Sequence, residues 1–318
     1  MEGFLLIFLS IVLEAIPFVM IGALISSLIH LFVSEETIAR IIPKNKFLGL
    51  VAGSLMGIVF PVCECAIVPI VKRLIKKGVP IDIAITFMLA VPIVNPVVLA
   101  STYYAFGNDI NMMALRGIGG LIGAILVGVV VGKYMGSPDV LKDEVKKVKV
   151  KKMHKHDTGC GCGCQSTKRS LKRPIKKKEK QGIWRSVKGI MLHTSRELYS
   201  VGRFLIAGAF LSAMMQTFVP REMILSIGNN EVSSILVMMA MAFILSLCSE
   251  ADAFIARTFV SQFTTGSIVA FLVLGPMIDI KNTLMLSSGF KTKFIMKLIL
   301  TISIICFVMA MGINLLGV

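Results

Sequence analysis

Long apolar runs follow one another along most of this chain, and one long polar stretch interrupts them near the middle. A helix needs ~20 apolar residues to cross the ~30 Å hydrocarbon layer of a membrane. Runs of that length predict about eight membrane-spanning helices, at Phe4–Val33, Phe47–Val71, Pro80–Phe106, Met112–Tyr134, Leu198–Val219, Val232–Thr258, Gly266–Ser288 and Phe294–Val318.

The composition supports a membrane protein. Hydrophobic residues make up 55% of the chain and charged residues only 16%, with a mean hydropathy of +0.83, whereas soluble domains average ~45–50% apolar residues. We therefore predict an all-α, polytopic membrane protein with broken helices and three parts. These are a first transmembrane repeat at 1–135, a basic cytoplasmic linker at 136–190 and a second transmembrane repeat at 191–318.

The two membrane segments share a sequence pattern at an offset of about 185 residues. The motif GALIS at Gly22 matches GAFLS at Gly208, and Cys63-Glu-Cys-Ala matches Cys248-Ser-Glu-Ala. Further along, Pro92 matches Pro276 and Asn95 matches Asp279. An even number of spans in each copy predicts that both copies enter the membrane in the same orientation. Transporters often bind substrate between such repeats, although a duplication that serves only packing is the alternative.

The net charge of +16 is concentrated in the polar stretch from Lys142 to Lys188, so it indicates topology rather than nucleic-acid binding. Because Lys and Arg are retained on the cytoplasmic side, this linker should be cytoplasmic. The same rule places the shorter cluster at Lys72–Lys77 inside, and counting spans outward places both termini in the cytoplasm. Lys291 and Lys293 then fall on the outer side, against the rule. The basic linker is also suited to anionic lipid headgroups.

Helix breaks are expected where Pro and Gly interrupt the predicted spans. Proline inside a helix frees backbone carbonyls, which in lipid must face protein, water or a ligand. Transmembrane helices also tolerate single kinks, so we give weight to the breaks that recur at matching repeat positions. These involve Gly57, Pro61 and Pro69 around PVCEC, Pro92 and Pro96 around Asn95, and Gly275 and Pro276 before Asp279.

Ionisable residues inside the predicted spans are a second signal of function, because a charge at mid-bilayer costs at least a few kcal/mol unless it is paired, solvated or neutralised. The acidic candidates are Glu14, Glu64, Glu250, Asp252 and Asp279, and the cations Arg203, Arg257 and Lys281 could neutralise some of them. Asp252 and Arg257 are five residues apart and Asp279 and Lys281 two, so neither pair can meet on a regular helix. We therefore expect partners on other helices.

The cysteines form two groups. Cys63, Cys65 and Cys248 lie at the repeat-related breaks, where thiols beside carboxylates would suit a soft cation or a thiophilic metalloid. A buried free cysteine is also an ordinary small hydrophobe, which is how we interpret Cys306. The second group, Cys160, Cys162 and Cys164, follows His154 and His156 in the linker. Its spacing is not a zinc-finger pattern, and it predicts capture of a soft metal or metalloid ion, with a solvated linker as the alternative.

These motifs resemble those of the bacterial predicted-permease family that includes the organoarsenical efflux permeases (ArsP/YraQ-type). The resemblance rests on FPVCECAIVPIVKRLIKKGVP, ITFMLAVPIVNPVVL and LCSEADAFIA, and it covers both membrane segments but not the linker. It implies a permease, with roles for Cys63, Cys65, Pro92 and Asn95 and less directly for Cys248 and Glu250. A small residue commonly stands between the paired cysteines in that family, whereas this chain has Glu64. The resemblance also implies a second small membrane subunit, and a homo-oligomer is left open.

We predict a multi-pass permease of the cytoplasmic (inner) membrane, not an enzyme, that exports a thiophilic metalloid, organometalloid or soft cation. The predicted substrate and coupling residues are Cys63, Glu64, Cys65, Pro92, Asn95, Cys248, Glu250, Asp252 and Asp279. The chain has no nucleotide-binding motif, so an ion gradient should drive transport, and no cofactor is expected beyond an ion at the linker. The alternatives are a membrane thiol oxidoreductase and a metal-sensing membrane subunit that transports nothing.

Overall fold

The computed structural model describes residues 2–32, 45–59, 62–135, 140–141, 183–218 and 230–317. Apart from one isolated bridge between Leu141 and Phe290, the regular structure in these ranges is helical, which confirms the all-α prediction for the described part of the chain. The predicted linker at 136–190 lies mostly outside these ranges, and its last residues already belong to a helix that begins at Ile183.

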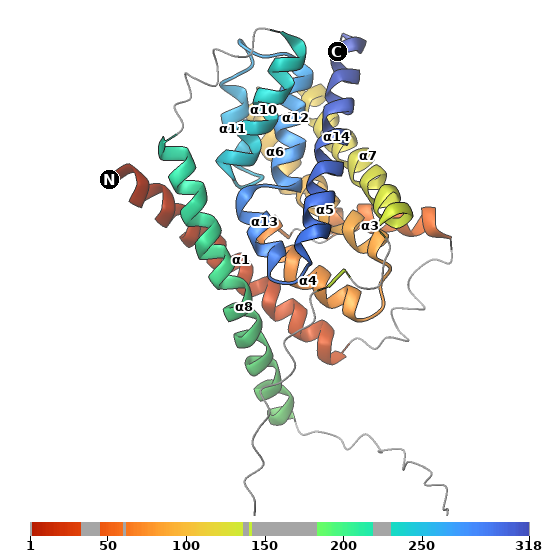
Figure 1. Ribbon diagram of the computed structural model, residues 1–318, viewed down its shortest axis with the longest axis vertical. Helices are drawn as coiled ribbons and strands as arrows, with labels where there is room; N and C mark the ends of the chain where they lie inside the picture. Colours follow the sequence, from red (N-terminus) through yellow and green to blue (C-terminus); the bar gives the residue numbers. More distant parts are fainter. Residues whose placement is uncertain are drawn as a thin grey trace, which may run out of the picture.

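The described helices fall into two sets with the same order of long and short elements (Figure 1). The first half contains α1 (Glu2–Phe32), α3 (Lys46–Val59), α4 (Glu64–Lys76), α5 (Ile81–Val94), α6 (Pro96–Ala105) and α7 (Ile110–Tyr134). The second half contains α8 (Ile183–Phe218), α10 (Glu231–Leu245), α11 (Asp252–Arg257), α12 (Thr265–Met277), α13 (Ile280–Ser287) and α14 (Thr292–Leu316).

Several of these helices are long and apolar enough to cross a membrane. Four described stretches meet that test, at Phe4–Leu28, Ile110–Tyr134, Thr265–Ser287 and Thr292–Leu316, and the bent pair α5–α6 would be a fifth. The prediction of eight spans is not confirmed. The expected continuous spans at 47–71 and 232–258 are each two short helices, α3 with α4 and α10 with α11, separated by breaks. A run of apolar residues indicates burial in lipid or protein, but does not reveal whether the helix continues through it.

The short helices turn back on themselves. Gly49, Gly53 and Gly57 of α3 meet Ile83, Phe87 and Val91 of α5 in the same order, so α3 and α5 run in the same direction. The intervening α4 runs back, because it joins α5 through a tight turn at Lys77–Pro80 in which Gly78 has φ +95°. In the second half, Ser234 of α10 lies beside Ser267 of α12 and Ala242 beside Gly275. Each half therefore contains a helical hairpin whose tip lies inside the molecule.

The two halves are arranged in opposite directions. Phe4, at the start of α1, stacks edge-on against Phe210 near the end of α8 with 5.3 Å between ring centroids, while Thr194 near the start of α8 donates to Ser27 near the end of α1 (3.0 Å). The first turns of α7 likewise share a groove with Met309 and Ile313 of α14. The prediction that both halves enter the membrane in the same orientation is therefore wrong. The physical reason is that a returning hairpin adds no crossing, so each half crosses an odd number of times.

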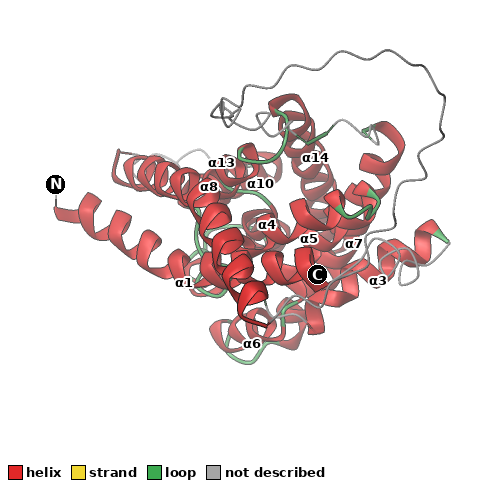
Figure 2. Ribbon diagram, turned by 90° about the horizontal axis from the view of Figure 1, so that it is seen from below, coloured by secondary structure: helices red, strands yellow, loops and turns green. Residues whose placement is uncertain are grey.

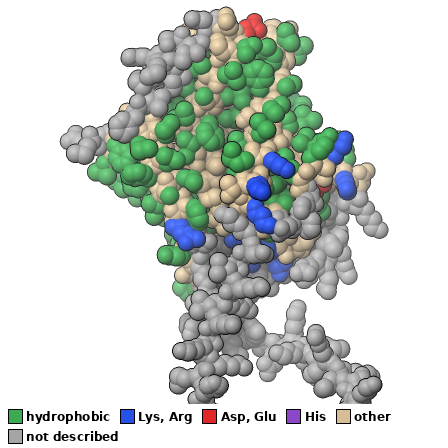
Figure 3. Space-filling view, viewed as in Figure 1, with side chains coloured by type: hydrophobic (Ala, Val, Ile, Leu, Met, Phe, Trp, Pro, Cys, Tyr) green, Lys and Arg blue, Asp and Glu red, His purple; other side chains and the backbone are tan. Residues whose placement is uncertain are grey.

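Basic residues gather at one end of the molecule. Lys291 donates its backbone N–H to Val140 (3.0 Å), just after α7, and Lys72 lies against Gly289 in the turn before α14. The end of α7 and the start of α8 lie toward this end, and the facing surface in Figure 3 shows Lys and Arg side chains toward it. Lys291 and Lys293 thus share an end with the other basic clusters.

Both termini lie toward the opposite end from the start of α8 (Figure 1). The end of α14 there receives the start of α12, through a hydrogen bond from the Gly266 N–H to Asn314 Oδ1 (2.9 Å). This arrangement does not confirm the prediction that the linker and both termini are cytoplasmic. The count of spans failed because it treated each hairpin as one crossing.

The core lies between α5 and α12, which are buried along most of their length. By contrast, α1 and α8 pack on each other at one flank of the bundle (Figure 2). Only 11% of the apolar window of α1 is buried, against 78% for the stretch that contains α12 and α13, so α1 offers most of its apolar surface to the surroundings. That flank, rather than the core, borders the candidate site.

Candidate functional site

The tip of the first hairpin carries a buried carboxylate that is paired with the other half. Glu64 is the first residue of α4, and Cys63 stands at its N-cap position. Lys281 Nζ on α13 donates to Glu64 Oε1 at 3.0 Å, and both side chains are buried. This ion pair confirms the expectation that the intramembrane carboxylates find partners on other helices. Lys281 also lies 3.8 Å from Asp279 Oδ2, because Asp279 precedes α13 rather than continuing it.

The matched residues Asn95 and Asp279 cap the second parts of two broken helices. The Asn95 side chain accepts the Val97 N–H at 3.0 Å where α5 and α6 meet at 40°. Pro92 lies inside α5, three residues before Asn95. Asp279 accepts the Asn282 N–H at the start of α13. Capping satisfies N–H groups that have no partner inside the helix. Neither residue lines the cavities described below, although Asp279 lies 3.8 Å from Lys281, which does.

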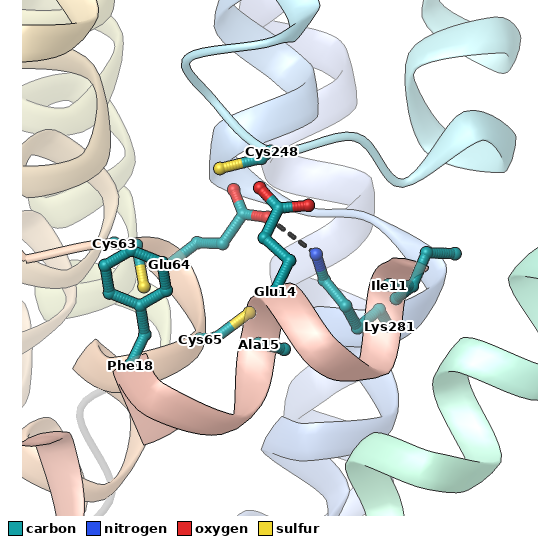
Figure 4. A pocket seen from close by; sticks show the side chains of 9 residues that line it. All are labelled: Ile11, Glu14, Ala15, Phe18, Cys63, Glu64, Cys65, Cys248 and Lys281. Atoms are coloured by element: carbon teal, nitrogen blue, oxygen red, sulfur yellow. Dashed lines mark hydrogen bonds and ion pairs between the residues drawn. The ribbon is translucent and has the colours of Figure 1, made fainter. Parts of the chain in front are cut away.

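Three thiols face one cavity at the hairpin tips (Figure 4). Cys63 and Cys65 reach it from α4, and Cys248 reaches it from the connection between α10 and α11. All three are free thiols, and Cys248 Sγ donates to Glu250 Oε2 at 2.6 Å. The volume of the cavity is only about 10 Å³, room for about one water molecule. Glu14 of α1, Glu64 and Lys281 also line it. The structure thus brings together five of the predicted site residues: Cys63, Glu64, Cys65, Cys248 and Glu250.

A second, larger cavity adjoins the first. Its volume is about 290 Å³, and it shares Ile11, Glu14, Cys248 and Lys281 with the smaller one. It extends along α1 toward Gln216 on α8, whose side-chain amide donates to the Leu245 carbonyl at the end of α10. Ser246, which has a left-handed backbone conformation (φ 47°), ends α10 at this point. The thiols therefore lie at the inner end of a continuous cleft beneath α1.

A second ion pair between the halves lies at the other hairpin. Asp252 is the first residue of α11, as Glu64 is of α4, and Arg116 Nη2 of α7 donates to Asp252 Oδ2 at 2.8 Å. Arg116 also donates to Thr102 Oγ1 (2.7 Å) and to the Ser249 carbonyl (2.9 Å), and it is fully buried. Arg257 instead lies over the Phe106 ring. Asp252 therefore binds the two halves together and lies outside the thiol cavity.

Sequence reasoning missed Arg116 as the partner of Asp252. The signal was present, because Arg116 is an ionisable residue within the otherwise apolar run Met112–Tyr134. Glu14 was recognised as an intramembrane charge but was not placed at the site. The structure adds Glu14 to the candidate site. Glu14 lies near the middle of the apolar stretch of α1 and lines the cavity together with the thiols.

No metal-binding cluster is formed among the residues that the structure describes, where no three His, Cys, Asp or Glu side chains converge as ligands. The predicted linker ligands Cys160, Cys162, Cys164, His154 and His156 lie outside those residues.

Comparison with known proteins identifies the family. The model of a family described as a predicted permease matches residues 1–315. The chain is 45% identical to the UPF0718 protein YcgR of Bacillus subtilis (strain 168) over 300 residues, which is 94% of this chain and 92% of that protein. It is 40% identical over 301 residues to a Streptococcus mutans protein named as a putative two-component membrane permease complex subunit, covering 95% and 91% of the two chains.

A more distant relative is the UPF0718 protein YraQ of Escherichia coli (strain K12), at 24% identity over 115 residues, or 36% of this chain and 33% of that one. No solved structure matches the chain. The whole-length family match, the helices able to span a membrane and the motifs around Cys63 and Cys248 agree with one another. The chain therefore belongs to this family of predicted permeases and is an integral membrane protein.

Proposed function

We propose that this permease moves its cargo between the two halves, through the cavity lined by Cys63, Cys65 and Cys248. One observation carries the proposal: thiols from both hairpin tips face the same space, beside the buried Glu64–Lys281 pair. A path between halves requires that each half contributes to the binding site, as these residues do. Helix breaks that line a cavity are a recurrent feature of transporters.

The cargo is a thiophilic species, either a metalloid, an organometalloid or a soft cation. Thiols are soft ligands and favour soft or borderline partners over Mg²⁺ or Ca²⁺. The three cysteines are reduced and unbridged, which is the state that can bind such a cargo. Transport is outward and is driven by an ion gradient, since the sequence carries no nucleotide-binding motif.

The two halves act as inverted copies. Their matching element orders and the antiparallel pairs α1–α8 and α7–α14 support this proposal. A carboxylate also begins the second helix of each hairpin, Glu64 in α4 and Asp252 in α11. In transporters with inverted repeats, the site opens alternately to the two sides as one repeat adopts the arrangement of the other. The Glu64–Lys281 and Asp252–Arg116 pairs are then the contacts that the two arrangements would remake.

The protein lies in the cytoplasmic (inner) membrane with its basic end inside. The clustered lysines and the basic linker support this orientation through the positive-inside rule. In this proposal both termini lie outside. The name of the Streptococcus relative supports a second membrane subunit for this chain too. The exposed apolar face of α1 faces lipid or such a subunit, and a homo-oligomer is compatible with the same face.

The linker captures a soft ion near the cytoplasmic side and is auxiliary to transport. Glycine between Cys160, Cys162 and Cys164 permits the tight backbone that one ion would require. Ser at all three positions should lower the number of silver ions bound per purified protein, because the linker thiols are lost while the cavity thiols remain, and it should leave flux close to that of the parent. Unchanged silver binding would refute capture, and complete loss of flux would refute the auxiliary role.

Flux in proteoliposomes tests the cargo site directly. Arsenite, a trivalent organoarsenical and silver ion are supplied in turn across an imposed proton gradient, with and without a protonophore. Cys63→Ser, Cys65→Ser and Cys248→Ser should each lower flux at least about tenfold, because a hydroxyl is a far poorer soft ligand than a thiol. Cys306→Ser, on the apolar α14, is the matched control and should transport as the parent does.

Parent-like flux in all three site variants would contradict the proposal. A Cys63–Cys65 disulfide that cycles during electron transfer, without flux of any cargo, would instead favour the thiol oxidoreductase.

A further inference from the structure

The charges around the thiol cavity do not balance. Lys281 is the one basic residue among the described side chains that line either cavity, and Glu64 already holds it at 3.0 Å. Asp279 adds a second carboxylate 3.8 Å from the same ammonium. Glu14 then contributes a further carboxylate from α1. Among these four groups three are acidic and one is basic, so the cleft has an excess of negative charge.

Glu64 has an oxygen available to a ligand. Its side chain is only 2% exposed, and Oε2 has no hydrogen-bond partner among the described residues, although Oε1 is paired with Lys281. Glu64 points into the cavity with the thiols (Figure 4). A buried carboxylate oxygen without a donor is costly. A cationic or hydrogen-bond-donating guest would satisfy it.

Glu14 lies where its carboxylate can discriminate between cargoes of different charge. It lies near the middle of the Phe4–Leu28 stretch, where a carboxylate facing lipid would be strongly disfavoured. Its side chain is exposed, and it lines both cavities together with Cys248. No ion pair joins Glu14 to another described residue, unlike Glu64 and Asp252. Its charge is therefore available to the cargo.

We propose that the cleft selects a positively charged thiophilic cargo, and that Glu14 is the specificity-determining residue that rejects anionic thiophiles. This inference rests on the proposed function for the thiols as the cargo site and adds the charge of the cargo. The thiols supply the soft ligands, and the carboxylates of Glu14 and Glu64 supply the charge complement. A soft monovalent cation fits this combination, and an arsenical that carries a carboxylate or sulfonate does not.

Two thiol reagents with the same reactive group and linker but oppositely charged end groups test the selection without any transport assay. Cationic methanethiosulfonate ethylammonium and anionic methanethiosulfonate ethylsulfonate react with Cys248 in the purified full-length protein, and peptide mass spectrometry follows the modification. The ratio of the two rates is divided by the ratio for a small thiol in solution. We expect this corrected ratio to favour the cation by at least about tenfold, since a unit charge at ~6 Å and an effective dielectric constant of ~20 corresponds to more than that factor.

Glu14→Gln should lower the corrected ratio about tenfold, because the amide keeps the size of the side chain and removes its charge. Glu231→Gln, which removes an exposed carboxylate at the start of α10, is the matched control and should leave the ratio unchanged. Glu14→Asp should largely restore the preference, which shows that the loss in Glu14→Gln arises from charge and not from misfolding.

A corrected ratio near unity in the parent would overturn the inference, and so would a ratio that Glu14→Gln leaves intact. Neither result depends on flux. Loss of flux in the cysteine variants together with a ratio near unity would keep the thiol site and remove only its preference for cations.

Discussion

At the scale of single residues, the site is organised by two ion pairs that each join one half to the other. Glu64–Lys281 lies at the thiol cavity, and Asp252–Arg116 lies at the second hairpin. The acidic members could be predicted from their position in apolar runs. Their partners could not, because they are separated from them by 217 and 136 residues and only the tertiary fold brings them together.

Breaking the Asp252–Arg116 pair should destabilise the protein. Arg116→Met leaves a buried carboxylate without its cation, and removing one partner of a buried pair costs ~3–5 kcal/mol. We expect a clear fall in the temperature at which the detergent-solubilised protein loses its monodisperse peak in gel filtration. Asp252→Asn should also lower it, because Arg116 is then left without an anion.

The double variant Arg116→Met/Asp252→Asn is the control for this pair. It removes both charges and should recover part of the loss, giving a positive coupling in the double-mutant cycle. Strictly additive effects would contradict a direct interaction between the two side chains.

At the scale of elements, the breaks were predictable from Pro and Gly, but the hairpins were not. The matched prolines Pro92 and Pro276 do stand just before the points where α5 and α12 give way to new helices. Whether a broken helix continues or turns back depends on what it packs against, and the ordered glycine contacts between α3 and α5 decide that here. Glycine also allows α1 and α8 to pack closely on the rest of the bundle. Gly22 of α1 lies against the Ala66 backbone, and Gly208 of α8 lies against the Lys281 backbone.

The contact at Gly22 predicts a specific sensitivity to side-chain volume. A Cβ there would lie 2.5 Å from the Ala66 carbonyl oxygen, so Gly22→Val must push α1 away from α4 and the thiol cavity. Overpacking of this kind costs ~1–3 kcal/mol, and we expect lower thermal stability together with faster modification of Cys248 as the cleft widens.

Gly312→Val on α14 is matched in residue type, and a Cβ at that position has nothing within 4 Å. The two variants therefore share the lower helix propensity of valine and differ in packing. Equal stability and equal Cys248 reactivity in both would show that α1 is not held through Gly22.

At the scale of the whole molecule, the repeat pattern in the sequence and the orientation of the halves have to be distinguished. The matched motifs indicated two related segments, but the orientation followed from counting crossings, and each hairpin made that count wrong by one. The distribution of basic residues in the sequence already conflicted with the expected orientation of the halves. Lys291 and Lys293 contradicted the positive-inside rule under the expected topology, and they obey it once both lie at the basic end.

The opposed arrangement of the halves is the central claim, and labelling at the two ends of α14 tests it most directly. Lys293→Cys and Leu316→Cys place one exposed thiol at each end of the same helix, in a background without the seven native cysteines. We predict that a membrane-impermeant maleimide labels Leu316→Cys in intact cells and Lys293→Cys only after permeabilisation. The reverse pattern, with the thiol at 293 accessible from outside and the thiol at 316 protected, would contradict the account and restore cytoplasmic termini.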